Sequence, residues 1–585
     1  MNSAEAKKFR RRVVLIAVVF TLAFGVVVGK VVQLQILDRS WLSEKAADSF
    51  RRISEVEGKR GVIFDAVYRE LAVTLDATDI GVHPDKINAS RELARVLAQA
   101  LGLSWGPVYK KLNAKASFVW LKRQAPPAEE TAVKAVAEQY KIARAFVFEA
   151  TRSRAYPHKQ LAGQVIGFVG LDGNGLEGLE AYYDRQLRGR KTRFTYLKDG
   201  KNRKFDLKKK LIADNAGHNV ILNIDASIQY ITEEAVAKTV TEHRAKSGLA
   251  VVIVPKTGAV KAMAHFPLFD PNRFRKYRQQ AWRNRIVTDT FEPGSTLKVF
   301  TIAAGLDSRA ASPDTVLDCE NGRYYVGRVP IHDTHGYQLL SVSDIVKFSS
   351  NIGAAKLGQA MGKEVLYTTL NNFGYNRLTH IDSPGEVDGS LADFHRWRPI
   401  DAANIAFGQG IAVTAIQLAT AMAAIANDGV MMQPRIVQAV TDHNGVVVRK
   451  VAPKVLRRAV SAETARKVRS MLVRVVEQGG TGTRAAVKGF TVGGKTGTAQ
   501  KIGPDGAYSR SDFVSSFVGF VPASRPKLVI LVVVDEPRKY TYGGVVAAPA
   551  FRAIAQSSLN YLNIPMEAGP VKIEENGLPV KKANL

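Results

Sequence analysis

The chain of 585 residues is too long for one hydrophobic core, and its 46% hydrophobic and 23% charged content excludes a largely disordered protein. The formal net charge of +30 indicates an anionic partner. A membrane surface or an anionic wall polymer would explain this charge as well as nucleic acid would. The sequence contains no zinc-finger spacing and no RNP-type aromatic string, which are motifs of nucleic-acid-binding proteins. Cys319, the single cysteine, excludes an internal disulfide and a cysteine-based zinc site, and the ten histidines form no HExxH pair.

The first predicted element is an apolar helix near the N-terminus. Val13–Gly29 carries no charge, and the apolar character resumes after Lys30, so the run meets the ~20-residue requirement of a bilayer. The basic residues just before it predict that the N-terminus lies in the cytoplasm: Lys7, Lys8, Arg10, Arg11 and Arg12. A cleaved signal peptide is the alternative, but no clear A-x-A site follows. We therefore expect a cytoplasmic tail at 1–12 and an uncleaved transmembrane anchor at 13–35, with the rest of the chain outside the cytoplasmic membrane.

The segment after the anchor is mixed in character and rich in charge. "RGVIFDAVYRELAVT" (60–74) alternates like a strand before a turn, and "SRELARVLAQALGL" (90–103) has helical spacing behind a Ser90 cap. "GNGLEGLEAYYDRQL" (173–187) predicts a helix that opens on glycines. The polar, turn-rich stretch 198–217 predicts a boundary between domains.

A second unit follows. "NVILNI" predicts a strand, and Asp225 can cap the helix after it. The stretch 248–266 predicts a hairpin whose two apolar strands are joined by "PKTG", and 414–428 predicts a helix. Three late strands and a last helix are expected at 489–500, 515–522, 527–537 and 548–562. Strands at both ends with helices between them predict an α+β sheet built from distant segments.

The stretch "FEPGSTLKVF" (291–300) places Ser295 three positions before Lys298, directly after Pro293-Gly294. On a helix the two side chains share one face, which suits a nucleophile with its base, but a capping serine beside a surface lysine has the same pattern. The ordinary pKa of lysine is about 10.4, so a lysine base needs desolvation or a second cation nearby. "SRPK" (524–527) has the same spacing, so this pair alone decides little.

Two further motifs follow in the chain. Ser349 and Asn351 form an S-x-N in "KFSSNIGAAKLG", which is also an ordinary helix N-cap pattern. K-T-G occurs at 256–258, at the tip of the predicted hairpin, and again at 495–497, in a predicted strand along which its glycine lets a ligand lie. The order S-x-x-K, S-x-N, K-T-G is the signature of penicillin-recognising serine acyl-transferases, and it selects the second K-T-G.

With these motifs the chain resembles the class B penicillin-binding proteins of the FtsI type over nearly its whole length. The resemblance rests on "RGVIFD", "GLEGLE", "TFEPGSTLKVFT", "FSSNIGAAKLG", "GGKTGTAQ" and "SSFVGFVPA", and "SSNIG" is closer to the division branch than to the elongation branch. It implies an α+β penicillin-binding transpeptidase (serine β-lactamase-like) domain at 216–563, an elongated pedestal (dimerisation) domain at 36–215 and a flexible tail at 564–585. "AVYREL" replaces the family's usual Arg-Asn-Gly turn after "RGVIFD", outside the three motifs.

The resemblance implies a D,D-transpeptidase that crosslinks septal peptidoglycan during division through a serine acyl-enzyme, with release of terminal D-Ala. The implied catalytic residues are Ser295 as nucleophile, Lys298 as base and Ser349 as relay. The implied substrate-binding residues are Asn351, Lys495, Thr496, Gly497 and Thr498, and the oxyanion hole uses the N–H groups of Ser295 and Thr498. No metal or organic cofactor is implied.

The implied partners are stem peptides ending in D-Ala-D-Ala, β-lactams as covalent inhibitors, the membrane, an FtsW-type glycosyltransferase and other divisome membrane proteins, but no nucleic acid. The implied location is the bacterial cytoplasmic (inner) membrane, with a single pass and the catalytic domain on the periplasmic side. A β-lactamase or D,D-carboxypeptidase shares the motifs, although the anchor and the pedestal argue against a compact β-lactamase. An elongation-type transpeptidase and a non-enzymatic septal scaffold or β-lactam sensor are also compatible with the motifs.

Overall fold

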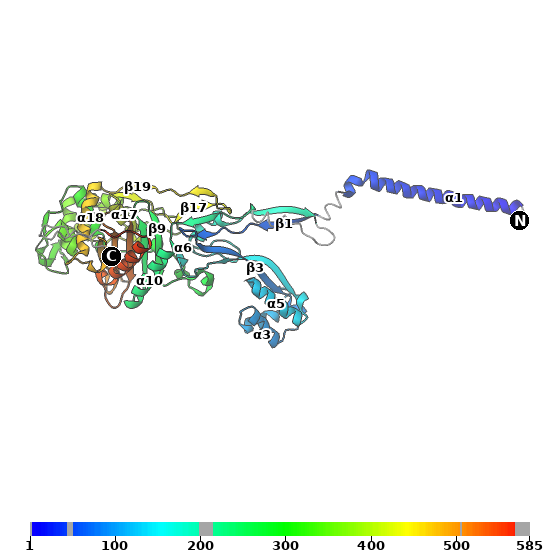
Figure 1. Ribbon diagram of the computed structural model, residues 1–585, viewed down its shortest axis with the longest axis horizontal. Coiled ribbons are helices and arrows are strands. Elements are labelled where there is room, and N and C mark those ends of the chain that lie inside the picture. The colour runs from blue at the N-terminus through cyan, green and yellow to red at the C-terminus, as the bar shows by residue number, and fades with distance from the viewer. Residues whose placement is uncertain (1–2, 44–50, 198–213, 504–505, 568–585) are drawn as a thin grey trace, which may run out of the picture. The chain divides into compact units, whose positions relative to one another are not determined.

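The computed structural model describes residues 3–43, 51–197, 214–503 and 506–567 (Figure 1). It divides into two compact units: Met1–Lys59 with Gly189–Gly217, and Arg60–Arg188 with His218–Leu585. Most of the predicted boundary region at 198–217 and of the predicted tail at 564–585 lies outside the described residues.

The first unit contains a long apolar helix and a two-stranded ribbon. Helix α1 (Ser3–Val32) continues into the π-helical turn η1 (Gln33–Leu37). Within the span Lys7–Leu37, an 18-residue window has a mean hydropathy of 2.5 and is not buried, so the helix is long and apolar enough to cross a membrane. Strands β1 (Arg51–Glu57) and β6 (Lys191–Leu197) pair antiparallel.

A seven-stranded sheet of the second unit joins segments that are far apart in the chain. Its order is β18-β17-β7-β2-β3-β4, with β5 paired to β3. The strands are β2 (Ile63–Phe64), β3 (Glu70–Val82), β4 (Val119–Ala125), β5 (Phe146–Ala155), β7 (Asn219–Leu222), β17 (Val437–Thr441) and β18 (Val447–Lys450). β7, the predicted first strand of the second domain, lies parallel to β2 and antiparallel to β17. The sheet therefore carries strands from both predicted domains.

A separate small core lies at the end of β3. Helices α3 (Arg91–Ala100), α4 (Trp105–Leu112) and α5 (Pro127–Gln139) enclose it with β3, β4 and β5, as Figure 1 shows for α3 and α5. The Ser90 cap is confirmed, because its side chain accepts a hydrogen bond from the Leu93 N–H at 3.0 Å.

The helix predicted within 173–187 begins only at Gly178 and is divided in two at Tyr183. The structure has short helices instead: α6 (Gly163–Ile166), α7 (Gly178–Tyr182) and α8 (Asp184–Leu187). Gly178 has a φ of 59°, in the left-handed region, and a Cβ there lies only 2.5 Å from the carbonyl oxygen of Val165. Because the turn at Gly178 packs closely on α6, helix α7 begins only at this residue, after most of the glycine-rich stretch.

A buried ion network fastens α7 to the strands before it. The guanidinium of Arg60 lies 2.7 Å from Glu180, and the guanidinium of Arg154 lies 2.6 Å from the other oxygen of the same carboxylate. Arg60 also reaches Asp184 at 2.7 Å. The Glu180 side chain is 0% exposed, so the network is desolvated. It explains two sequence motifs at once, because Arg60 opens "RGVIFD" and Glu180 ends "GLEGLE".

The second, five-stranded sheet has the order β20-β21-β22-β8-β9 and is antiparallel throughout. Its strands are β8 (Ser247–Val254), β9 (Ala259–Phe266), β20 (Gly493–Ile502), β21 (Tyr508–Val521) and β22 (Leu528–Asp535). The predicted hairpin at 248–266 is confirmed. Both faces are buried: Val251 and Leu531 point into one core, and Ala250 and Val532 point into the other.

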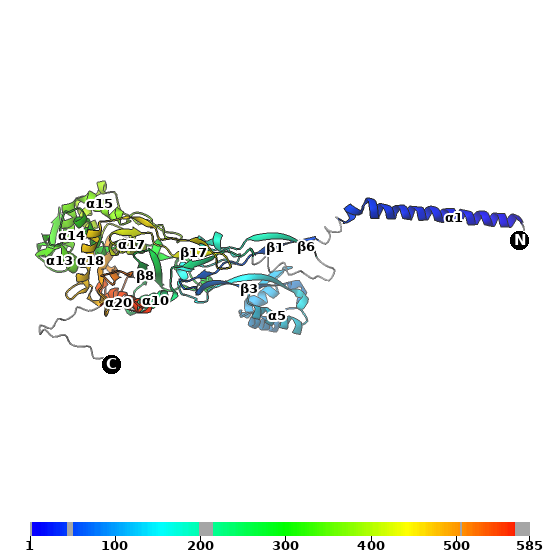
Figure 2. The same cartoon turned by 45° about the horizontal axis from the view of Figure 1, so that its top comes forward.

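Helices cover both faces of this sheet. Figure 2 shows α10 (Ala226–Glu242) and α20 (Ala548–Tyr561) on one side of β8, and α17 (Ala415–Ala426) on the other. The Asp225 cap on α10 is confirmed by a 2.9 Å hydrogen bond from the Ser227 N–H. Every residue of α17 is buried, which accounts for its uniformly apolar sequence. The α+β class predicted for the chain is therefore confirmed.

The other helices of this part are α11 (Arg285–Thr288), α12 (Lys298–Asp307), α13 (Val342–Phe348), α14 (Asn351–Met361), α15 (Lys363–Asn372), α16 (Pro399–Ala406), α18 (Ala462–Val476) and α19 (Gly543–Val546). Four two-stranded ribbons complete it: β10 (Thr290–Phe291) with β15 (Val413–Thr414), β11 (Val316–Asp318) with β14 (Leu339–Ser341), β12 (Arg323–Val326) with β13 (Val329–His332), and β16 (Val430–Met432) with β19 (Val455–Arg458).

We expect Glu180→Ala to lower the free energy of unfolding by about 3–5 kcal/mol, because it removes the carboxylate that pairs with the buried Arg154 and leaves the buried Arg60 with Asp184 alone. Urea unfolding followed by tryptophan fluorescence measures this change. Lys467→Ala is the control, since it breaks an exposed pair with Glu463 on α18 and is expected to change stability by at most about 1 kcal/mol. Equal, small effects of the two substitutions contradict the importance of the buried network.

Candidate active site

Ser295 lies in a tight turn directly before a helix. It is the middle residue of the 3-10 turn η6 (Gly294–Thr296), and α12 begins only at Lys298, slightly later than a helix start at the serine. Gly294 has a φ of 55°, and a Cβ there lies 3.0 Å from the Thr498 carbonyl oxygen on β20. A glycine is therefore required for the serine turn to pack against this strand.

Lys298 is fully buried, and its ammonium group faces oxygens from other segments. Its Nζ donates to the Ser295 Oγ at 3.2 Å, the Ser349 carbonyl oxygen at 2.6 Å and the Asn351 Oδ1 at 2.7 Å. Burial lowers the pKa of Lys298 to about 7, against a smaller opposing effect from the charge of Asp333. A large fraction of this lysine is therefore neutral near neutral pH and able to accept a proton.

Ser349 occupies a strained position between α13 and α14. Its backbone is left-handed, with φ 65° and ψ 40°, which is uncommon for a residue with a Cβ. Its Oγ accepts hydrogen bonds from Lys298 at 3.2 Å and from Lys495 at 2.9 Å. The N-cap of α14 is Ser350, whose Oγ accepts from the Gly353 N–H at 2.9 Å. The capping role and the lysine-contacting role are thus divided between two adjacent serines.

Lys495 is the second buried ammonium group, and it comes from β20. Burial lowers its pKa well below the usual range, and the positive charge of Lys298 lowers it further. The sequence suggested that a second cation would make Lys298 a usable base. In the structure, burial accounts for the lowered pKa of Lys298, and repulsion between the two cations acts on Lys495.

The two threonines of this strand make different contacts. The Thr496 Oγ1 lies 3.2 Å from the hydroxyl of Thr481, and it also accepts from Lys495 Nζ at 3.3 Å. The Thr498 Oγ1 accepts from the Gly543 N–H at 3.1 Å. Ser295, Lys298 and Ser349 form a serine–lysine cluster. The structure brings Lys495 and Thr496 to this cluster and places Thr498 beside the start of α19.

Gly497 faces the serine turn. A Cβ at this position lies 2.4 Å from the Ser516 Oγ and 3.0 Å from the Pro293 carbonyl oxygen, so the glycine permits close packing of β20 on the turn. β20 is an edge strand of the five-stranded sheet, and its outer side has no strand partner among the described residues. An extended peptide can therefore pair with this strand.

Asn351 and Asp333 hold the turn that carries Ser349. The Asn351 Nδ2 donates to the His332 carbonyl oxygen at 2.8 Å, so both ends of this amide are engaged. Asp333 accepts from the Asn351 N–H at 2.5 Å, the Ile352 N–H at 3.1 Å and the Ser350 hydroxyl at 2.5 Å. The sequence did not predict a role for Asp333, because it lies in no motif and reaches the start of α14 from 17 residues away.

The chemistry of this arrangement follows from its contacts. A half-buried serine hydroxyl, an amine with a pKa near 7 and a relay hydroxyl form one hydrogen-bonded chain, which a second lysine extends. Such a chain can remove the proton from Ser295 during attack on a carbonyl carbon and deliver it to a leaving amine.

Comparisons with known proteins identify the family of this chain. Residues 248–556 match the family of the penicillin binding protein transpeptidase domain, and residues 55–222 match the penicillin-binding protein dimerisation domain. The probable peptidoglycan D,D-transpeptidase PenA of Neisseria meningitidis is 34% identical over 96% of this chain and 95% of its own. The peptidoglycan D,D-transpeptidase FtsI of Escherichia coli is 32% identical over 94% of this chain and 91% of its own.

A solved structure is similar as well. The crystal structure of penicillin binding protein 3 from Mycobacterium tuberculosis, complexed with aztreonam, has 29% sequence identity and a TM-score of 0.68, and covers 88% of this chain and 98% of its own. The chain therefore belongs to the FtsI-like class B penicillin-binding proteins, which are serine-type transpeptidases.

We expect the rate of Ser295 acylation by penicillin to rise with pH through a midpoint at about 7, where Lys298 loses its proton. The sign follows from the lowered pKa: below the midpoint the lysine is charged and accepts no proton, and above it the lysine is neutral. Stopped-flow acylation rates across this range test the prediction, with circular dichroism to show that the fold is unchanged. A rate that is flat across the midpoint contradicts it.

We expect Asp333→Asn to slow penicillin acylation by about tenfold to a hundredfold, because one of the carboxylate oxygens that accept hydrogen bonds at the start of α14 becomes a donor. The pH midpoint of the rate should also fall, since the Asp333 charge raises the pKa of Lys298. Asp393→Asn is the control: Asp393 caps the exposed turn Phe394–Arg396, and its replacement should change neither quantity. A normal rate with an unmoved midpoint in Asp333→Asn contradicts the positioning role.

Proposed function

We propose that this class B penicillin-binding protein crosslinks the stem peptides of septal peptidoglycan during cell division, through an acyl-enzyme on Ser295. The observation that supports it most is the buried Lys298, whose Nζ lies 3.2 Å from both the Ser295 Oγ and the Ser349 Oγ. A base of lowered pKa that touches both a nucleophile and a relay hydroxyl suits a two-step acyl transfer.

The proposed first step is attack by Ser295 Oγ on the carbonyl of the penultimate D-Ala. Neutral Lys298 takes the serine proton, and Ser349 passes a proton to the amine of the terminal D-Ala as the peptide bond breaks. In the second step an amine of a neighbouring stem peptide attacks the ester and gives its proton back along the same path. Ser295 is thereby regenerated and one peptide bond replaces another, so no cofactor is required.

The substrate would be held along the edge of β20. Its terminal carboxylate would lie near Lys495, Thr496 and Thr498, whose cation and hydroxyls suit an anion. The N–H groups of Ser295 and Thr498 would bind the oxyanion, and Asn351 would hold a substrate amide. Gly497 would keep the strand close to the serine turn. β-Lactams would acylate Ser295 as mimics of the D-Ala-D-Ala end.

The cellular setting is proposed on the same basis. Helix α1 is long and apolar enough for a single membrane pass, and the basic residues before it favour an N-terminus in the cytoplasm, which leaves the catalytic part outside the inner membrane. We assign a cytoplasmic tail to 1–12, the anchor to 13–35, the pedestal to 36–215, the transpeptidase domain to 216–563 and a tail to 564–585. The similarity to a relative named FtsI and the "SSNIG" stretch favour division over elongation, with an FtsW-type glycosyltransferase and divisome membrane proteins as partners.

We expect Ser295→Ala to abolish covalent labelling by fluorescent penicillin and to fail to restore septa in cells depleted of the wild-type protein. Ser524→Ala is a matched control, because "SRPK" has the same serine–lysine spacing, and it should label normally. Septa supported by Ser295→Ala would instead indicate a scaffold. A fluorescent fusion that follows the side wall rather than the septum would indicate elongation.

A further inference from the structure

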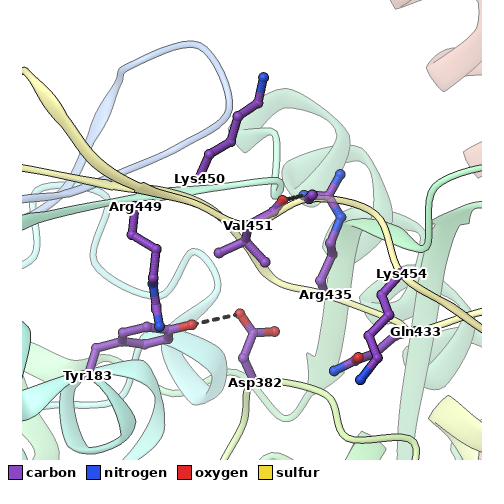
Figure 3. Close-up of a pocket in the computed structure, with 9 residues that line it drawn as sticks. Tyr183, Asp382, Gln433, Arg435, Arg449, Lys450, Val451 and Lys454 are labelled. Atoms are coloured by element: carbon purple, nitrogen blue, oxygen red, sulfur yellow. Dashed lines mark hydrogen bonds between the residues drawn. The ribbon is translucent and has the colours of Figure 1, made fainter.

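A cavity of about 280 Å³ lies away from the serine–lysine cluster, and Figure 3 shows its lining residues. Tyr183, between α7 and α8, and Asp382, in the loop after α15, form one wall together, joined by a hydrogen bond of 3.1 Å. The rest of the lining comes from the segment before β17, from the end of β18 and from the segment that follows β18. None of the lining residues belongs to the active site described above, so the cavity is a separate feature.

The lining is strongly basic. Four of the lining residues are cationic and one is acidic; Figure 3 shows the Lys450 side chain directed away from the other lining side chains, which leaves Arg435, Arg449 and Lys454 beside the Asp382 carboxyl group. Among the residues that the structure describes, none of these four takes part in an ion pair. An uncompensated positive concavity of this kind attracts anions.

The contacts that these cations do make leave them available to a ligand. Arg435 donates to two backbone carbonyl oxygens, of Val451 at 2.6 Å and of Thr257 at 3.4 Å. The Arg449 guanidinium lies over the Tyr183 ring, 5.8 Å from its centroid, which orients the planar group without neutralising its charge. Lys454 is exposed at the rim.

The carboxyl group of Asp382 is occupied elsewhere. It accepts hydrogen bonds from the backbone N–H groups of Ile436 at 2.6 Å and Val437 at 2.7 Å, and from the Tyr183 hydroxyl at 3.1 Å. Asp382 therefore fastens the start of β17 to α8, and it forms no ion pair with the arginines and lysines around it among the described residues. The positive groups of the cavity keep their capacity for an external anion.

We propose that this cavity is a second binding site, for a ligand that carries phosphate or carboxylate oxyanions. The planar guanidinium of Arg449 suits bidentate contact with such a group, and Lys454 adds an exposed charge. The remaining lining residues are Gln433, Val451 and Ala452. The volume lies near the lower end of ligand sites, at roughly 300 Å³, and holds a pyrophosphate or a single acidic residue. The proposal goes beyond the transpeptidase reaction and does not depend on it.

The test is isothermal titration calorimetry of the full-length protein in an uncharged detergent at constant ionic strength. One arm uses inorganic pyrophosphate, and the other uses muramyl dipeptide with free carboxylates beside its amidated form. We expect saturable binding in at least one arm, weakened by about tenfold or more in Arg449→Gln/Lys454→Gln. Binding of pyrophosphate alone identifies a phosphate ligand, and binding of muramyl dipeptide that amidation abolishes identifies a carboxylate ligand from the wall.

The control variant Lys238→Gln/Arg552→Gln removes the same charge from exposed positions on α10 and α20 and should bind like the wild type. Absence of saturable binding in both arms, or equal weakening by the control variant, overturns the proposal. Penicillin labelling of Ser295 should stay at the wild-type rate in Arg449→Gln/Lys454→Gln, which separates this site from the transpeptidase function. If the double variant does not fold, the single variant Lys454→Gln tests the proposal, because this side chain is exposed and its replacement should leave the fold intact. Binding equal to that of the wild type in Lys454→Gln overturns the proposal.

Discussion

The burial of Lys298, which forms no ion pair with any carboxylate that the structure describes, is the constraint on which the candidate active site depends. An ammonium group in a protein interior is unstable unless polar atoms surround it or its pKa falls. Here both occur: oxygens of Ser295, Ser349 and Asn351 converge on the Nζ, and the pKa falls to about 7. In the proposed reaction, the same desolvation that destabilises the charged form lets the lysine act as a base. The packing around α12 is thus part of the chemistry.

The rest of the catalytic part serves to bring three distant segments to this amine. α12 is buried against both the helices and the sheet, and β20 packs directly on the serine turn through Gly294 and Gly497. The left-handed backbone of Ser349 is held by Asp333, which binds the start of α14. A strained residue persists only where its surroundings determine its conformation, and here three hydrogen bonds to one carboxylate do so.

The seven-stranded sheet connects the active-site part to the segments before it. β2 and β7 pair in parallel, and β17, from much later in the chain, pairs with β7. The buried ion pairs of Glu180 with Arg60 and Arg154 connect α7 to the segments that carry the two arginines. β18, at the edge of this sheet, carries Arg449 into the basic cavity. The cavity therefore lies where residues of both matched family domains meet, and a ligand there would contact Tyr183, between α7 and α8, together with β18.

The sequence by itself determined whatever depends on near neighbours in the chain. The caps Ser90 and Asp225, the hairpin at 248–266, the wholly apolar α17 and the order of the three motifs all follow from local spacing. The break at Gly178, the pairing of β7 with β2 and the role of Asp333 do not, because each depends on contact between residues that are distant in sequence. Lys495 meets Ser349 across 146 residues, and only the packed fold decides that distance and the desolvation that it brings. Residue type and spacing named the chemical groups, whereas the lowered pKa of Lys298 came from tertiary burial, which no local pattern encodes.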